Sequence, residues 1–544
     1  MIKKNQSVEI EITGITSEGN GVGRAENMAV FVPLTAVGDY ARVKIVKVLK
    51  SYAFGILEEI LRPSENRIEP DCPVFEKCGG CTFRHISYET ELQIKNDFIK
   101  DAFKRIGGLN PDFEEITGCD ETDYYRNKAQ YPVSEQNGKA VCGFYSRRSH
   151  RIVPFTACRL QPEIFRQIVD SVIEYINENK IPAYNEEKHN GFIRHIYLRK
   201  GYHSDKIMLC IVVFNKSVTD RLKGLAVKIS AEFPQIKSVL VNVNNQNTNV
   251  ILGKENHLLY GSENITDIMC DNKILLSPMS FYQVNTCQAE KLYRIAEEYA
   301  ELSGNETLLD LYCGAGTIGL SMYDKAKRLT GVEVIPQAIE NAKTNAKINN
   351  IKNAEFICGD AGQIAFQLVD KGERPDVIIV DPPRKGCDKE TLDAILKMSP
   401  ERLVMISCNP ATAARDCRIL CDSGYVIRRI RGVDLFSRTG HVETVILLSQ
   451  LKPDDVIHID VELDELDTTA SEMKPTYDDI KKYIMDKYNL KVSSLYISQI
   501  KRKNNLEVGE SFNKPKSENT KQPNCPKEKA DAIEDALRHF KVLR

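Results

Sequence analysis

The sequence predicts a multidomain protein. We expect a small N-terminal β-barrel, a central mixed α/β domain, and a C-terminal α/β domain with a doubly wound, mostly parallel sheet, followed by a small α-rich tail. Three observations lead to this fold class. The chain has 544 residues, too many for one ordinary core. Its first 60 residues contain short strands broken by glycine, and helices and strands alternate after Gln288.

Composition excludes several classes of protein. Hydrophobic residues make up 42% and charged residues 28%, which excludes a wholly disordered or fibrous chain. Apolar runs such as Asp376–Val380 are strand-length and far short of the roughly 20 residues that cross a bilayer, so we expect no membrane partner. The formal net charge of -2 still permits a local basic patch for nucleic acid. Sixteen cysteines and no signal peptide predict a cytoplasmic protein in a reducing compartment.

The first predicted domain spans residues 1–60. Three segments alternate between apolar and polar residues, namely Ser7–Thr13, Ala29–Val32 and Ala41–Val46, and the segment Gly19–Gly23 supplies a turn. Evenly spaced strands with glycine turns are typical of a small, OB-like β-barrel. Such a barrel can be purely structural or can bind a ligand.

A central domain is predicted over residues 61–270. Residues 61–85 are rich in Pro, Gly and Cys, and apolar residues then recur at helical spacing from Glu89 to Ile106. This helical segment, 89–107, is a candidate to pack on the C-terminal domain. The rest is mixed, with strand candidates at Gly191–Leu198 and Ser238–Asn242.

Three cysteines of the central domain have the spacing of a metal site. Cys72, Cys78 and Cys81 form a C-x5-C-x2-C pattern, and His85 would complete a Cys3His set for zinc. An iron–sulfur cluster, which thiolates alone can hold, is the alternative. The spacing by itself leaves both open and places zinc slightly ahead.

The C-terminal domain, predicted over residues 271–450, opens with a glycine-rich loop after a strand. Gly314, Gly316 and Gly319 satisfy the G-x-G-x-x-G pattern of a dinucleotide site. Asp310 lies four residues before the first glycine, and Glu333 ends the next strand, where its carboxylate can accept both hydroxyls of a ribose. These two carboxylates favour S-adenosylmethionine over a nicotinamide cofactor.

Three further polar groups follow strands of the same sheet. Asp381 comes directly after a hydrophobic strand and precedes two prolines, and Cys408 ends another strand before an Asn-Pro turn. His441 and Glu443 lead into the final strand. Because ligands bind at the carboxyl edge of such sheets, we predict that Asp381 contacts the cofactor and that Cys408 is a nucleophile rather than a small buried hydrophobe.

Together these motifs resemble the RNA uracil-5-methyltransferases. The matching segments are Asp310-x-x-Cys-Gly-x-Gly, Asp381-Pro-Pro-Arg, Ser407-Cys-Asn-Pro, His441-Val-Glu and, upstream, Ser277-Pro-Met-Ser-Phe-Tyr-Gln-Val-Asn285. The resemblance implies a class I methyltransferase fold, with Cys408 as nucleophile and Glu443 as general base. It also implies that four residues bind S-adenosylmethionine: Gln283, Tyr312, Glu333 and Asp381.

The implied chemistry explains these residue types. Carbon 5 of uracil is a poor nucleophile, so the Cys408 thiolate first adds to carbon 6. The resulting enolate takes the methyl group, and Glu443 then removes the carbon 5 proton so that the cysteine is expelled. The target base must be out of any stack to be attacked from its face.

The resemblance also bears on the metal and the RNA. In the 23S ribosomal RNA branch of this family the cysteine pattern holds a 4Fe–4S cluster, and Cys158 is the matching fourth ligand, with Cys119 and Cys142 as competitors. The N-terminal barrel resembles a TRAM domain, an RNA-binding module. We therefore expect a monomer that methylates a uridine in 23S ribosomal RNA, with transfer RNA as the alternative substrate.

Two other functions remain open. An Asp-Pro-Pro motif can also serve methylation of an exocyclic base amine, which needs no cysteine nucleophile. A metal-stabilised RNA-binding protein with an inactive catalytic domain is the other reading, which intact Cys408, Glu443 and Asp381 oppose.

The tail, residues 451–544, lies outside this resemblance. It opens with acidic alternation at Ile457–Leu463, and a Lys/Asn/Pro-rich linker, Asn513–Lys529, precedes a last short helix. In between, two helices are predicted, the second capped by Ser494 and closed by Lys501–Lys503. One face of the first helix carries Tyr477, Ile480, Ile484 and Tyr488. This pattern predicts either a helix-turn-helix-like nucleic-acid module or a small packing domain.

Overall fold

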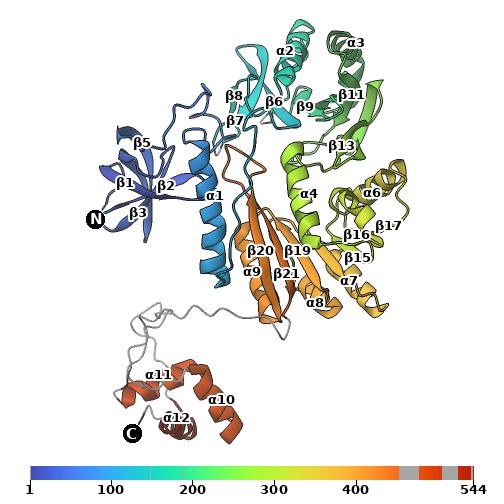
Figure 1. Ribbon diagram of the computed structural model, residues 1–544. Helices are drawn as coiled ribbons and strands as arrows, with labels where there is room; N and C mark the ends of the chain where they lie inside the picture. The colour runs from blue at the N-terminus through green and yellow to red at the C-terminus, as the bar shows by residue number, and fades with distance from the viewer. Residues whose placement is uncertain are drawn as a thin grey trace. The chain divides into compact units, whose positions relative to one another are not determined.

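The computed structural model describes residues 2–147, 149–186, 188–451, 477–504, 506, 525–540 and 543 (Figure 1). The chain divides into two compact units, Met1–Asp455 and Val456–Arg544. No helix among the described residues is long and apolar enough to cross a membrane.

A closed five-stranded barrel begins the first unit, as predicted (blue in Figure 1). Its strands close in the order β1-β2-β3-β5-β4. Their bounds are β1 Ser7–Ile15, β2 Asn20–Ala25, β3 Met28–Pro33, β4 Tyr40–Val48 and β5 Tyr52–Arg62. Alternate residues point inward, and Val30, Val32 and Ala53 are fully buried there.

Helix α1 (Tyr88–Ala102) follows the cysteine-rich segment and continues into a π-helical turn, η1 (Phe103–Gly107). The helix begins where the Ser87 side chain accepts a hydrogen bond from the Thr90 N–H. Ile99, Ala102 and Phe103 belong to the same hydrophobic cluster as strands of the C-terminal sheet. The predicted helical segment 89–107 therefore packs on the C-terminal domain.

The central domain is built on a seven-stranded sheet in the order β12-β11-β10-β9-β6-β7-β8. The strands are β6 Lys128–Gln136, β7 Lys139–Tyr145, β8 Ile152–Pro154, β9 Ile193–Lys200, β10 Ile207–Val213, β11 Ile236–Val243 and β12 Glu255–Gly261. Its helices are α2 Glu163–Glu178, η2 Lys216–Leu222 and α3 Lys223–Glu232, and all three contribute to the core of this sheet. The strand predicted from Gly191 begins two residues later, because Gly191 has a positive φ of +92°, outside the β region.

A hairpin and a long helix connect the two sheets. The hairpin pairs β13 (Ile265–Met269) with β14 (Asn272–Leu276). Helix α4 (Thr286–Ala300) starts three residues earlier than the predicted helix at Ala289, because the Asn285 side chain caps it by accepting from the Gln288 N–H.

The C-terminal sheet confirms the predicted doubly wound architecture. Its order is β17-β16-β15-β18-β19-β21-β20, and β21 is antiparallel to both of its neighbours whereas the other pairs are parallel. The strands are β15 Thr307–Leu311, β16 Arg328–Glu333, β17 Ala354–Cys358, β18 Val377–Val380, β19 Arg402–Ser407, β20 Tyr425–Val433 and β21 Glu443–Gln450. The helices are α5 Thr317–Ser321, η3 Tyr323–Lys325, α6 Pro336–Ile348, α7 Ala361–Asp370, α8 Lys389–Met398 and α9 Pro410–Asp422.

The described residues of the second unit form three helices around a core of their own. They are α10 Tyr477–Tyr488, α11 Ser494–Lys503 and α12 Lys527–His539, and Ile484, Ile497 and Ile533 are buried between them. The cap of α11 is Ser493, one residue before the predicted Ser494. Helix α12 begins inside the predicted linker, whose earlier part lies outside the described residues together with the acidic segment 457–463. The shared core is what a packing domain requires, and the helix-turn-helix interpretation stays a prediction.

Candidate active site

The carboxyl edge of the C-terminal sheet collects the predicted site residues. Strands β15, β18 and β19 are in parallel register, with Val380 paired to both Leu311 and Met405. Tyr312 and Asp381 therefore leave neighbouring strands at the same level, and the Asp381 N–H lies 3.4 Å from the Leu311 carbonyl oxygen. This is the edge at which open α/β sheets bind ligands.

The glycine loop turns sharply after β15. Tyr312, Gly314 and Gly316 have positive φ angles of +67°, +55° and +79°. A Cβ placed on Gly314 would meet nothing within 4 Å, whereas one on Gly319 would lie 3.0 Å from the Asp310 carboxylate. The first part of the loop therefore leaves open space for a ligand, and the last glycine lets helix α5 pack closely on the strand.

Two carboxylates, Glu333 and Asp310, accept hydrogen bonds from the backbone of this loop. Glu333 accepts hydrogen bonds from the N–H groups of Gly314 (3.2 Å) and Ile335 (2.9 Å), one on each oxygen. Asp310 accepts from the Gly319 N–H at 2.9 Å through Oδ2, while its buried Oδ1 has no partner among the described residues. Burial raises the pKa of Asp310 to about 7. Glu333 is thus held beside the open part of the loop, as a ribose-binding carboxylate must be.

The other two predicted cofactor residues are held by different parts of the chain. Gln283 is buried, and its backbone carbonyl oxygen accepts a hydrogen bond from Asn127 Nδ2 at 2.8 Å. This bond joins the segment to the central domain. The Tyr312 hydroxyl lies 3.1 Å from Thr391 Oγ1 on α8. Tyr312 therefore lies at the sheet edge, and Gln283 lies in the loop before α4.

Cys408 and Glu443 lie side by side. In the antiparallel pair of β19 and β21, Ser407 is opposite Thr444, so the next position brings Cys408 opposite Glu443. Burial raises the pKa of Glu443 to about 8, and the charge of Asp381 adds to this effect. Burial, followed by Glu443 and Asp381, raises the pKa of Cys408 to about 11. A thiol, a carboxylate at the edge of ionisation and Asp381 thus share one site.

Arg384 is a member of this site that the sequence did not single out. Its positive charge lowers the pKa of both Cys408 and Glu443, against the effect of burial. Burial and then the charge of Arg384 lower the pKa of His441, which is therefore neutral at pH 7. The signal was the place of Arg384 directly after the two prolines that follow Asp381.

The predicted metal ligands gather around one cavity, of about 180 Å³, in the central domain. Its lining includes Cys72, Cys78, Cys81 and Cys158. The competing fourth ligands lie elsewhere: the Cys119 thiol points to the Asp434 carbonyl oxygen (3.5 Å), and Cys142 is buried in the core of the central sheet.

His85 does not join these cysteines. Its Nε2 lies 3.1 Å from the Thr35 carbonyl oxygen of the barrel, and the ring does not line the cavity. The Cys3His set considered for zinc is therefore not assembled, because His85 packs between the barrel and the cysteine-rich segment.

The fit of the four thiols to a metal depends on its size. Among the described residues, no three Cys, His, Asp or Glu side chains converge closely enough to hold one metal ion. Zinc needs its sulfur ligands at about 2.3 Å, whereas a four-iron cluster is larger and spreads its thiolates farther apart. Three arginines also line the cavity and suit the negative charge of thiolates: Arg84, Arg126 and Arg159.

Two family models match the chain. Residues 87–451 match the model described as tRNA (Uracil-5-)-methyltransferase, and residues 3–57 match the TRAM domain. The first spans most of the chain and includes every residue of the sheet edge described above. The second coincides with the closed barrel.

Relatives and solved structures agree with these models. An uncharacterized RNA methyltransferase of Clostridium tetani is 42% identical over 448 residues, covering 82% of this chain and 97% of the relative. One of Halalkalibacterium halodurans is also 42% identical, covering 82% and 98%. The crystal structure of the Pyrococcus abyssi tRNA (uracil-54, C5)-methyltransferase in complex with S-adenosyl-L-homocysteine is 26% identical. It has a TM-score of 0.66 and covers 81% of this chain and 100% of its own.

Proposed function

Because the chain belongs to the tRNA (uracil-5-)-methyltransferase family, it is an S-adenosylmethionine-dependent RNA methyltransferase, and we propose that it methylates carbon 5 of a uridine in 23S ribosomal RNA through a covalent cysteine intermediate. One observation carries the mechanism. Cys408 and Glu443 flank the last residue pair of β19 and β21, Ser407 and Thr444, and the charges of Glu443 and Asp381 both raise the pKa of Cys408. A nucleophile and a base on the same face of a bound uracil are what this chemistry needs.

Four residues are assigned to the cofactor. Glu333 would accept the ribose hydroxyls, Asp381 and Gln283 would contact the methionine end, and Tyr312 would border the adenosine. The open space at Gly314 supports this placement, because a side chain there would occupy the ligand's position. When bound, S-adenosylmethionine supplies a methyl group on a positively charged sulfur.

The chain's own residues carry out the covalent steps. The Cys408 thiolate forms a bond to carbon 6 of the uracil, and the electron pair of the carbon 5–carbon 6 double bond moves to an enolate. Carbon 5 then bonds to the methyl group as the sulfonium carbon–sulfur bond breaks, leaving a neutral thioether. Glu443 takes the carbon 5 proton, the double bond re-forms, and Cys408 leaves as a thiolate.

Arg384 assists both protein groups. With a pKa near 11, Cys408 is a thiol at neutral pH, and the nucleophile is the thiolate. Since Arg384 lowers the pKa of Cys408 and of Glu443, it favours the charged form that each group needs. The positive sulfur of the cofactor would act in the same direction.

The barrel offers a surface that suits RNA. Phe31, Tyr52 and Phe54 lie together on its outer face, with ring centroids 5.5 to 5.7 Å apart. Lys47 is opposite Phe54 on the neighbouring strand, and Lys44 is opposite the next outward residue, Ile56. Aromatic rings on which bases stack, flanked by lysines that meet phosphates, are typical of single-strand binding.

We assign the four cysteines around the central cavity to a 4Fe–4S cluster with a structural role. Methyl transfer moves no net electrons, so the cluster would organise the RNA-binding part of the chain. Cys158→Ala should lower the iron content and the visible absorption of anaerobically purified protein, whereas Cys142→Ala, outside the cavity, should change neither. Zinc in the wild-type protein, with no iron, would overturn this assignment.

Ribosomal RNA is proposed because the barrel and the cysteine set resemble the 23S branch of the family. Transfer RNA is the second candidate, because the archaeal transfer RNA enzyme superposes over its whole length. We further propose that the protein is a monomer and acts in the cytoplasm.

The test is incubation of the full-length protein with S-adenosylmethionine and 5-fluorouridine-substituted 23S ribosomal RNA or transfer RNA. Fluorine cannot leave as a proton does, so a covalent protein–RNA adduct should survive on a denaturing gel. The RNA that forms it identifies the substrate. Methylation of ordinary RNA without any adduct on its fluorinated form would instead favour methylation of an exocyclic amine.

A further inference from the structure

The segment that carries the proposed base is mostly buried, although His441 near its end is exposed. It connects β20 to β21 and runs from Asp434 to Val442, directly before Glu443. Asp434 and Ser437 have no exposed surface, and Thr439 has 5%. We call residues 434–442 the base loop.

A lysine of helix α1 holds the start of the base loop. Lys95 Nζ lies 2.7 Å from Glu91 Oε1 and 2.6 Å from Asp434 Oδ1, and all three side chains are fully buried. The same ammonium donates to the Phe436 carbonyl oxygen at 3.2 Å. Lys95 therefore uses its donors to join α1 to two points of the base loop, across 339 residues of sequence.

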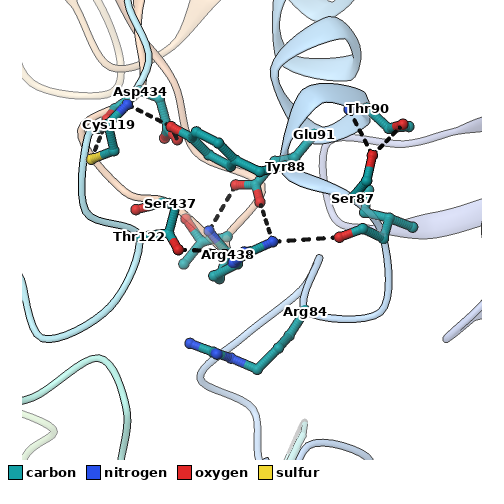
Figure 2. Close-up of polar contacts among 12 residues, drawn as sticks. Arg84, Ser87, Tyr88, Thr90, Glu91, Cys119, Thr122, Asp434, Ser437 and Arg438 are labelled. Carbon is teal, nitrogen blue, oxygen red and sulfur yellow. Dashed lines mark hydrogen bonds and ion pairs between the residues drawn. The ribbon is translucent and has the colours of Figure 1, made fainter. Parts of the chain in front are cut away.

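Two more residues of α1 reach the same loop (Figure 2). The Tyr88 hydroxyl donates to Asp434 Oδ2 at 2.8 Å and accepts from the Cys119 N–H at 2.6 Å. Glu91 accepts from the Arg438 N–H at 2.7 Å, and the Arg438 guanidinium lies 3.7 Å from its second oxygen. The Glu91 carboxylate thus binds both the Lys95 side chain and the backbone of the base loop.

The rest of the base loop is held from the cysteine-rich segment, the central domain and the barrel. The Arg438 carbonyl oxygen accepts from the N–H groups of Thr82 (2.8 Å) and Phe83 (3.1 Å), just after Cys81. The Ser437 carbonyl oxygen accepts from the Tyr125 hydroxyl at 2.9 Å. A Cβ on Gly440 would lie 2.1 Å from the Ser17 carbonyl oxygen, so the loop touches the turn between β1 and β2.

Cys408 has a different support. It follows β19, which lies inside the C-terminal sheet with β18 on one side and β21 on the other. Its position is therefore fixed chiefly by strand pairing: α1 packs on α9, which follows Cys408, but no hydrogen bond joins α1 to Cys408 among the described residues. Glu443 also begins a paired strand, β21, but the loop that leads into it is held by α1 in addition.

We infer that Tyr88, Glu91 and Lys95 are positioning residues for the general base: helix α1 fixes the base loop, so that removal of the carbon 5 proton depends on α1 whereas attack by Cys408 does not. This rests on the proposed function of Cys408 and Glu443. A displacement of about 1 Å in a reacting group can lower a rate by about 100-fold. Loss of the Lys95 contacts would remove two of the hydrogen bonds at the start of the base loop and leave β19 paired. Asp434 would keep its bonds to Tyr88, Gln288 and Thr117, so we expect a displacement of the loop and not its release.

Two substrates separate the steps in a single-turnover experiment with the full-length protein. The adduct on 5-fluorouridine RNA needs the nucleophile and methyl transfer but no proton removal. Release of methylated ordinary RNA needs all three. For Lys95→Met we expect adduct formation on fluorinated RNA within about twofold of wild type. Release from ordinary RNA should slow by about 100-fold, so that a methylated covalent adduct accumulates.

Controls separate positioning from folding. Lys100→Met removes an exposed lysine of the same helix and should behave as wild type on both RNAs. Tyr88→Phe removes one hydroxyl and no charge, and we expect a smaller shift in the same direction in a protein that folds normally.

The outcomes are distinct. If wild type forms no adduct on fluorinated RNA, the proposed function fails and the inference with it. If wild type forms the adduct but Lys95→Met and Tyr88→Phe lose adduct formation and release in equal proportion, or lose neither, the positioning role is overturned. Accumulation of the methylated adduct in both variants supports it.

Discussion

Buried carboxylates occur in two regions of this protein, and they differ in what faces them. At the edge of the C-terminal sheet, one oxygen of Asp310 has no hydrogen-bond partner among the described residues, and the charge of Asp381 raises the pKa of Glu443. Beside α1, Glu91 and Asp434 each lie within 2.7 Å of the Lys95 ammonium. In the first region the carboxylates can still bind a ligand or a proton. In the second region Glu91 and Asp434 are both paired with Lys95.

Burial of the carboxylates has a different consequence in each region. Burial raises the pKa of Asp310 and Asp381 to about 7 and of Glu443 to about 8, which makes the sheet edge costly to the folded state at high pH. Beside α1, burial also raises the pKa of Glu91, but the charge of Lys95 opposes this, and removing one partner of such a buried pair is strongly destabilising. The proposed chemistry uses the first arrangement, and the proposed positioning of the base loop uses the second.

Removing the nucleophile should have the largest effect. For Cys408→Ala we expect methylation to fall by about 10⁴-fold or more and the adduct on 5-fluorouridine RNA to disappear. Binding of S-adenosylmethionine, measured by calorimetry, should be retained. Cys421→Ala, which changes a half-buried cysteine of α9, serves as the control and should keep activity. An active Cys408→Ala protein would contradict the covalent mechanism.

Opposite changes in stability should separate the two regions. Lys95→Met leaves two buried carboxylates uncompensated, so we expect the free energy of unfolding to fall by about 3–5 kcal/mol. Glu443→Gln removes a charge that burial disfavours, so stability at pH 8.5 or above should rise by a few kcal/mol, roughly. Denaturant unfolding of both variants beside wild type measures this. Two changes of the same sign would break the comparison.

The catalytic rate of Glu443→Gln should change in the opposite direction to its stability. A base that contributes general catalysis supplies about 10²- to 10⁴-fold in rate, so we expect release of methylated RNA to fall within this range. The variant should therefore be more stable and less active than wild type. Retained turnover would show that another group removes the proton.

The pH dependence of release should follow the ionisation of Glu443. Its folded pKa of about 8 lies above the ordinary value of 4.5, so the base is mostly protonated at pH 7 and the rate should rise with pH until it levels above about 8. Stability changes in the opposite direction to the rate: the stabilising contribution of this group is complete below its unfolded pKa and is lost as pH rises through about 8.

Arg384→Gln sharpens this test. Since Arg384 lowers the pKa of Glu443, its removal should move the midpoint of the pH–rate profile to higher pH. Single-turnover release between pH 6 and 9 gives both profiles. A pH-independent rate in the wild-type protein would exclude Glu443 as the titrating base.

The smallest effect is expected for a substitution in the barrel, whose proposed role is RNA binding and not catalysis. Phe54→Leu keeps apolar bulk but removes a ring, and we expect the Kd for single-stranded RNA to rise by about tenfold with little change in stability. Phe54→Tyr keeps the ring and should bind as wild type. Equal affinity in both variants would move the RNA surface elsewhere.

The sequence by itself was enough to predict which residues lie at the carboxyl edge of the C-terminal sheet. Asp310, Glu333, Asp381 and Cys408 each end or follow a short hydrophobic strand, and parallel strands bring their carboxyl ends to one edge. The barrel could also be predicted from the sequence, because alternation of apolar and polar residues over a few positions indicates which side chains face inward. In both cases the information lies within a single element and its turn.

Only the tertiary structure decided the contacts between distant segments. It brought Cys158 to the cavity of Cys72 and excluded His85, Cys119 and Cys142, which spacing alone could not do. It also paired Lys95 with Asp434. A lysine on an amphipathic helix reads as a solvated residue until its partner is known, because burial and pairing depend on which surface the helix covers. Local patterns encode elements, whereas the partners of a buried charge are set by packing.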